Sequence, residues 1–155
     1  MILVIAEKPS LARNIVAGIG KMERKNGYFE GLGYIVTWAF GHLFSLCDIE
    51  DYSGAESGGK WTLENLPCFP NDFKFKLRRE AGTKDVDDGV RRQFETIKSL
   101  CHRNDVDTIV NAGDSDREGE IIVRLCISNA EVTGKKLLRL WLPDQTPQTV
   151  AAALA

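Results

Sequence analysis

The apolar positions of this chain fall into short unbroken runs that alternate with stretches of helical spacing. The first run, residues 2–6, has no polar interruption and predicts a strand buried on both faces. The helix that we expect next begins at Pro9 or Ser10 and ends near Ile19, because its apolar residues recur along one helical face. The chain is therefore expected to open with a strand followed by a helix.

The middle of the chain departs from this alternation. Residues 28–38 predict a hairpin with Gly31 and Gly33 near its turn. Residues 39–70 contain many glycines, serines and prolines, and we expect mostly loops there. Residues 73–78 alternate strictly between apolar and basic side chains, which predicts an edge strand with one charged face.

The second half returns to alternating elements. We expect a helix at about 86–103, a strand at 106–112, a helix at 117–130, a strand at 136–142 and a helix from about 146. This order predicts an α/β fold with a mainly parallel central sheet and helices on both faces, plus the small hairpin and a loop-rich insertion. The helical pattern at the C-terminus has no stop signal, so we expect one domain over 1–155 taken from a longer protein.

Composition excludes some classes of protein. The chain is 43% hydrophobic and 27% charged, as globular domains are, and its net charge of −2 argues against a protein that coats nucleic acid by charge alone. The four cysteines match no zinc-binding spacing and predict reduced thiols in the cytoplasm. No apolar stretch approaches the roughly 18 residues of a membrane span, so we expect no membrane partner.

Acidic residues gather where two expected strands end. One acid, Glu7, follows the strand at 2–6, and four more lie just after the strand at 106–112: Asp114, Asp116, Glu118 and Glu120. Because parallel strands end at the same edge of a sheet, we expect these carboxylates to converge. Carboxylates at such short distances repel one another unless a cation neutralises them. The pattern predicts a site for magnesium, with manganese or calcium as substitutes.

Two other interpretations explain the acids less well. An EF-hand loop starting at Asp114 would need a glutamate at its twelfth position, where Leu125 stands, and the preceding segment resembles a strand. The simpler alternative is an exposed acidic turn that caps a helix. The pair Glu7 and Lys8, expected at the same edge, favours the metal site.

Four ordered segments resemble the Toprim domain of type IA DNA topoisomerases, most like the bacterial topoisomerase III group. The resemblance runs from residue 1 to about 145 and is carried by IAEKPSLAR at 5–13, VTWAFGHL at 36–43, WTLENLP at 61–67 and AGDSDREGE at 112–120. Four motifs in order are far more specific than any one of them.

The resemblance implies roles for the acidic residues. Glu7, Asp114 and Asp116 would bind magnesium, and Glu7 would also act as general acid toward the leaving 3′ oxygen during strand cleavage. Lys8 would contact the scissile phosphate, and Glu118 would support the metal or its waters.

The resemblance also implies contacts with DNA. His42 and Trp61 match positions of DNA contacts, and Arg117 would be a phosphate ligand. From the residues alone, His42 could be an ordinary loop residue, Trp61 could pack in the core and Arg117 could lie on a helix surface. Trp38 and Phe40 are expected in the core.

The family cuts one DNA strand with a tyrosine, passes a strand through and reseals the break. The tyrosines of this chain, at 28, 34 and 52, match none of that motif, so the nucleophile is expected in another domain and this chain alone should not pass strands. Implied partners are single-stranded DNA, the remaining domains of the same enzyme and a helicase. A Toprim primase or nuclease remains an alternative, as does a non-catalytic DNA-binding module that would not need Asp114 or Asp116.

Overall fold

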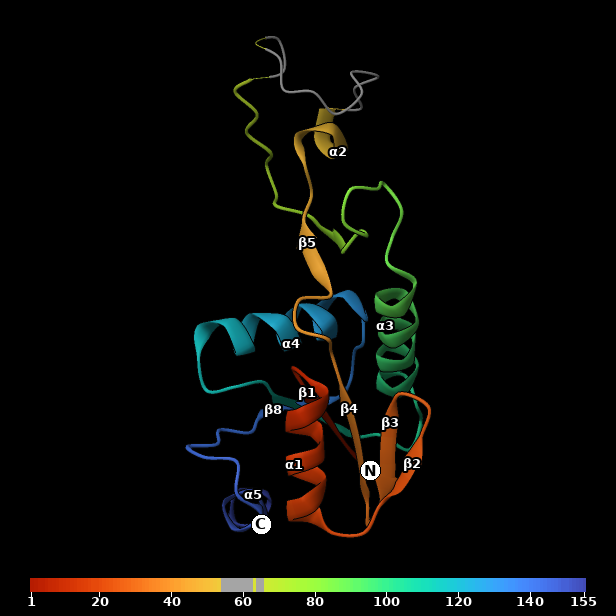
Figure 1. Cartoon of the computed structure of the whole chain (residues 1–155), viewed down its shortest axis with the longest axis vertical. Coiled ribbons are helices and arrows are strands. Elements are labelled where there is room, and N and C mark those ends of the chain that lie inside the picture. The colour runs from red at the N-terminus through yellow and green to blue at the C-terminus, as the bar shows by residue number, and fades with distance from the viewer. Residues whose placement is uncertain (54–62, 64–65) are drawn as a thin grey trace.

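The computed structural model describes residues 1–53, 63 and 66–155 (Figure 1). Trp61 therefore lies outside the described residues. The elements are β1 Ile2–Ala6, α1 Pro9–Ile19, β2 Glu23–Lys25, β3 Tyr28–Gly31, β4 Tyr34–Trp38, β5 Phe44–Leu46, α2 Ile49–Ser53, β6 Phe75–Leu77, α3 Asp88–Cys101, β7 Thr108–Ala112, α4 Arg117–Asn129, β8 Lys136–Arg139 and α5 Pro147–Leu154. Within this part of the chain, no helix is both long and apolar enough to cross a membrane.

The main sheet has six strands in the order β2-β3-β4-β1-β7-β8. Strands β4, β1, β7 and β8 are parallel neighbours, and the β2–β3–β4 side is antiparallel. Ala6, the last residue of β1, lies opposite both Trp38 and Ala112. The predicted mainly parallel sheet is confirmed, and its three central strands end at the same edge.

Alternate residues of β1 face two separate hydrophobic cores. Leu3 and Ile5 pack in the core beneath α3 and α4, whereas Val4 and Ala6 pack in the core beneath α1 and α5. All four side chains are fully buried. This confirms the prediction of helices on both faces, and Figure 1 shows α1 and α5 apart from α3 and α4.

The predicted hairpin is present and gains a strand. β3 and β4 pair antiparallel, and the turn between them contains Leu32 and Gly33, with φ of 52° and 85°. Two successive residues with positive φ match the twist of tight hairpins. The sequence did not indicate β2, a short strand with three exposed residues at the edge of the sheet.

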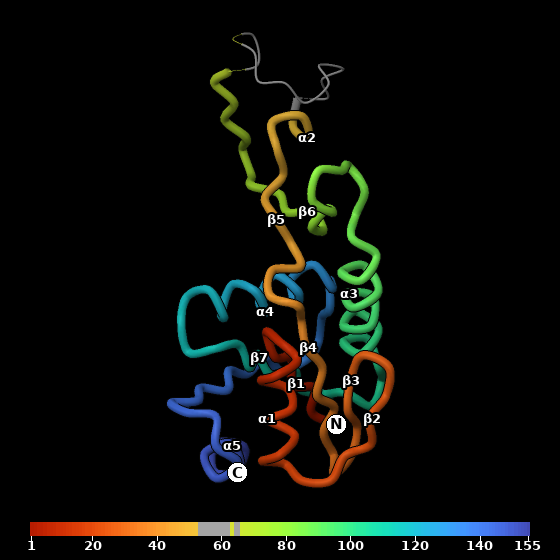
Figure 2. The backbone as a smooth tube through the Cα atoms, viewed as in Figure 1, coloured from red at the N-terminus to blue at the C-terminus, as the bar shows by residue number. Residues whose placement is uncertain are grey.

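The segment expected to be mostly loops contains β5 and α2. β5 pairs with β6 in a separate two-stranded sheet, which extends from the body of the molecule as an arm (Figures 1 and 2). The strand expected at 73–78 is shortened to β6. Its basic residue Lys76 forms ion pairs with Asp48, at 3.0 Å, and with Asp51. One residue of the basic face is therefore neutralised by nearby acids.

The start of α3 offers a test of this fold. Asp87 Oδ1 accepts hydrogen bonds from Gly89 N at 2.8 Å and Val90 N at 3.1 Å. We expect Asp87→Ala to lower the free energy of unfolding by about 1 kcal/mol, because a helix loses its N-cap. Asp87→Asn should retain most of this stability, and Asp88→Ala, next in the chain and exposed, should change it by less than about 0.5 kcal/mol. Urea denaturation measures all three, and equal losses in Asp87→Ala and Asp88→Ala would contradict the assignment.

Candidate functional site

The acidic loop, residues 113–116, lies against the first turn of α4 because two glycines leave room for it. A Cβ at Gly113 would lie 2.1 Å from the carbonyl oxygen of Gly119. A Cβ at Gly119 would lie 2.5 Å from Asp114 N and 2.6 Å from Glu7 Oε2. Only glycine permits this approach, and it brings the end of β7, the start of α4 and the carboxylate of Glu7 to one point.

The structure brings Glu7 and Asp114 together although they are 107 residues apart. The backbone N–H of Asp114 donates to Glu7 Oε2 at 3.1 Å. Lys8 Nζ donates to Glu7 Oε1 at 3.0 Å and to Asp114 Oδ2 at 2.6 Å. Two carboxylates from different strands therefore share one ammonium group.

This arrangement shifts the pKa values of Lys8 and Asp114. Hydrogen bonds to Asp114 and Glu7 raise the pKa of Lys8 well above its usual value. Burial acts to raise the pKa of Asp114, but the hydrogen bond from Lys8 and the charges of Lys8 and Arg139 outweigh it, so this pKa lies below its usual value. Asp114 is thus held as a carboxylate and Lys8 as a cation.

The other predicted site residues lie around this pair without joining it. Asp116 is the N-cap of α4, and its Oδ1 accepts from Gly119 N at 2.7 Å. Glu118 is exposed, with its Oε1 3.2 Å from His42 Nε2. Arg117 is exposed on the first turn of α4. No group of three or more His, Cys, Asp or Glu side chains among the described residues is arranged to hold a metal ion.

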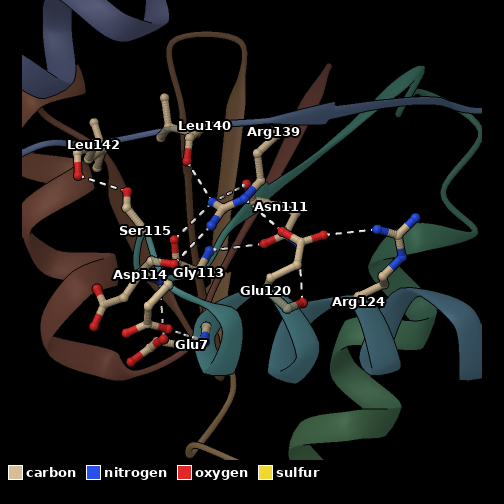
Figure 3. A network of polar contacts seen from close by, with 12 residues as sticks. Glu7, Asn111, Gly113, Asp114, Ser115, Glu120, Arg124, Arg139, Leu140 and Leu142 are labelled. Atoms are coloured by element: carbon tan, nitrogen blue, oxygen red, sulfur yellow. Dashed lines mark hydrogen bonds and ion pairs between the residues drawn. The ribbon is translucent and has the colours of Figure 1, made fainter.

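Arg139, at the end of β8, holds the acidic loop by hydrogen bonds and was not singled out as a site residue from the sequence. Its Nη1 donates to Gly113 O at 2.9 Å and its Nη2 to Asp114 O at 2.8 Å (Figure 3). Its Nε lies 2.8 Å from Glu120 Oε2. The partners are mostly backbone carbonyls, which leave no mark in a sequence.

The segment after β8 also contacts the loop. Gln145 Nε2 donates to Asp114 Oδ1 at 3.0 Å, and Ser115 Oγ donates to Leu142 O at 2.9 Å. Asp114 therefore receives hydrogen bonds from Gln145 and Lys8 on its two oxygens. Its side chain is held in one orientation.

Of the three predicted metal ligands, two, Glu7 and Asp114, are placed to share a hard divalent cation. Glu7 and Asp114 already share a cation, the ammonium of Lys8, and carboxylate oxygens are the ligands that magnesium prefers. The Lys8 side chain is 42% exposed, so it can turn toward solvent without disturbing the core. Asp116 has one oxygen committed to the helix cap. Whether these three residues bind metal remains a prediction.

Comparisons with known proteins agree on one family. The family described as Toprim domain matches residues 2–142. The chain is 39% identical over 153 residues to DNA topoisomerase 3 of Bacillus thuringiensis (strain Al Hakam), covering 99% of this chain and 19% of that protein. It is 40% identical to DNA topoisomerase 3 of Bacillus licheniformis and 38% identical to that of Bacillus subtilis (strain 168), each over 148 residues, 96% of this chain and 19% of the relative. The chain thus spans about a fifth of the length of these relatives.

The close approach of the two glycines can be tested by adding a methyl group. We expect Gly119→Ala to lower the free energy of unfolding by about 1–3 kcal/mol, because the new Cβ overlaps Asp114 and Glu7. Gly89→Ala is the matched control, since it also lies in the first turn of a helix and its Cβ would meet only Asp87 Oδ1, at 3.2 Å. Thermal and urea denaturation compare the two. A Gly119→Ala protein as stable as Gly89→Ala would contradict the close contact.

The shared ammonium can be tested through Asp114. In Lys8→Met we expect the pKa of Asp114 to rise, because the hydrogen bond and the charge of Lys8, which lower it, are removed while burial still acts to raise it. A carboxyl group whose pKa is lower in the folded than in the unfolded protein stabilises the fold at pH values above its unfolded pKa. This contribution is lost as the pH falls through the folded pKa. Because the variant no longer has the depressed pKa, it should be less stable than the parent at neutral pH. Carboxyl-carbon NMR titration measures the pKa. Lys8→Arg should keep it low, and an unchanged pKa in Lys8→Met would refute the pairing.

Proposed function

The chain belongs to the Toprim family, and from this premise we propose that it forms the metal-binding part of the active site of a type IA DNA topoisomerase. The relatives are named DNA topoisomerase 3, which supports this choice within the family. The complete enzyme would transiently cleave and rejoin single-stranded DNA with the help of magnesium, and so relax and decatenate DNA. The nucleophilic tyrosine would come from the part of the protein beyond this domain, so this chain alone should not pass strands.

One observation carries the proposal: two carboxylates at the ends of neighbouring parallel strands share a single cation. Glu7 follows β1 and Asp114 follows β7, and Lys8 Nζ lies within 3.0 Å of both. An acidic turn that only caps a helix needs no partner from a strand 107 residues away. The arrangement is that of a site that accepts positive charge.

Each residue then has a proposed task. Glu7 and Asp114 would hold magnesium, with manganese or calcium as substitutes, and Asp116 would contribute its second oxygen. The ion would stabilise negative charge on the phosphate. Lys8, once released, would pair with the scissile phosphate. Glu7, as general acid, would give the leaving 3′ oxygen the proton that the attacking tyrosine releases. Glu118 would support the metal or its waters.

The DNA would approach over the exposed rim of this site. His42 and Arg117 are exposed beside the acidic loop, and we propose that they contact the DNA backbone. Trp61 has the same proposed role and lies outside the described residues. The other domains of the enzyme are the proposed structural partners and a helicase a proposed functional one. The enzyme would act in the cytoplasm.

Calorimetric titration with magnesium and with manganese tests the metal site. We expect binding to the parent chain and its loss in both Glu7→Gln and Asp114→Asn, because each removes one of two carboxylates that share the ion. Asp88→Asn, an exposed acid on α3, should bind as the parent does. Lys8→Met should bind more tightly, because no ammonium competes for the carboxylates. Equal binding in the parent, Glu7→Gln and Asp114→Asn would exclude this site.

A further inference from the structure

A pocket of about 470 Å³ adjoins the acidic site on the side of β4. Its lining includes Pro9, which follows Lys8, and Phe40. The neighbours of Phe40 in the chain are tied to β1 and its continuation, with Ala39 N donating to Ala6 O and Gly41 N to Glu7 O, both at 2.9 Å. The pocket therefore has a fixed position beside Glu7. Its volume is in the range of about 300–1,000 Å³ that small-molecule sites occupy.

Aromatic rings form one wall of the pocket. Phe29 and Trp38 pack with ring centroids 5.6 Å apart, and Trp38 is buried as expected. Phe40, also expected in the core, is instead 43% exposed at the pocket. The residues on either side of it are held by backbone hydrogen bonds to β1 and Glu7, so its backbone position is fixed. An exposed aromatic ring in a pocket that also contains a buried aromatic pair can stack against a planar ligand.

The rim of the pocket is basic. Arg13, Arg24 and Lys25 line it, and no acidic residue does. Lys25 pairs with Glu23 at 2.9 Å, whereas neither arginine forms an ion pair with any described residue. The chain as a whole carries a net charge of −2, so three cations around one pocket form a local concentration of positive charge. Unpaired arginines at a pocket suit phosphate groups.

The floor of the pocket presents a hydrogen-bond acceptor. Gln93 is 6% exposed, and its Nε2 donates to Trp38 O at 2.7 Å and to Gly27 O at 3.1 Å. Both partners can only accept, so the orientation of the amide is fixed by chemistry. Oε1 accepts no hydrogen bond from the described residues. Because no fully buried side-chain oxygen or nitrogen in this part of the chain lacks a partner, Oε1 must be accessible, and Gln93 lines the pocket.

We infer that this pocket binds one nucleotide of single-stranded DNA, with the base against Phe40 and its phosphate at Arg13 and Arg24. Gln93 Oε1 accepts from an N–H group, which every nucleobase carries on its pairing edge. Stacking and a single acceptor do not select strongly among bases, so the pocket holds the strand with little sequence preference. The inference rests on the proposed action on DNA and adds a binding position beside the acidic site.

The test is the binding of fluorescently labelled single-stranded oligonucleotides to the chain, measured by anisotropy in EDTA. Leaving out metal separates this experiment from the metal titration. We expect Phe40→Ala and Arg24→Ala each to weaken binding at least about fivefold, the effect of losing a stacked base or a phosphate contact. Arg91→Ala, which removes an exposed arginine of α3 that does not line the pocket, should leave the affinity nearly unchanged. Equal affinities in all three variants would overturn the inference and leave the metal-site proposal standing.

A second measurement locates the ligand and identifies its form. NMR spectra of the labelled chain should show shifts of the Gln93 side-chain amide and the Phe40 backbone amide on adding the oligonucleotide. If deoxyadenosine monophosphate moves these signals and the oligonucleotide does not, the pocket binds a free nucleotide and the assignment to a DNA strand is wrong. If neither ligand moves them, the inference fails, even if the oligonucleotide binds elsewhere on the chain.

Discussion

The contact between Gly113 and Gly119 determines the geometry of the whole acidic site. It lets the first turn of α4 lie directly on the end of β7, so the backbone N–H of Asp114 can reach the carboxylate of Glu7. The parallel pairing of β1 with β7 supplies the other half of the geometry, because it places the ends of both strands at one level. Arg139 then holds the loop by its carbonyl oxygens. A methyl group at either glycine would displace several of these contacts at once.

Charge is organised locally in a chain that is nearly neutral overall. The carboxylates of Glu7 and Asp114 are compensated by Lys8, and the basic residues of the neighbouring pocket line it together with Pro9, which follows Lys8. The acidic site and the basic pocket are thus neighbours at the end of β1. Under the proposed function, such an arrangement would hold a polyanion at one surface and a metal ion at the other, which a uniformly basic surface would not allow.

The sequence predicted the sheet well because its central strands are rich in apolar residues, and β1 and β7 are buried along nearly their whole length. It did not predict the arm, because β5 and α2 are short and depend on ion pairs such as Lys76 with Asp48. The convergence of Glu7 and Asp114 followed from strand order. A helix cap among the acids was expected only as an alternative to the metal site, and Asp116 forms such a cap. The hydrogen bonds of Arg139 were not predicted, because their partners are backbone groups that are brought close only by the fold.

The acidic site joins residues that are far apart in the sequence, so its parts leave the ribosome at different times: Asp114 is bonded both to Glu7, 107 residues earlier, and to Gln145. β1 is synthesised first, yet its partner β7 begins about 100 residues later, and Gln145 later still. At about 5–20 residues per second, Asp114 is synthesised roughly 5–20 s after Glu7. Until then the nascent chain has isolated carboxylates and no shared cation. The acidic site is therefore assembled near the end of the synthesis of this domain.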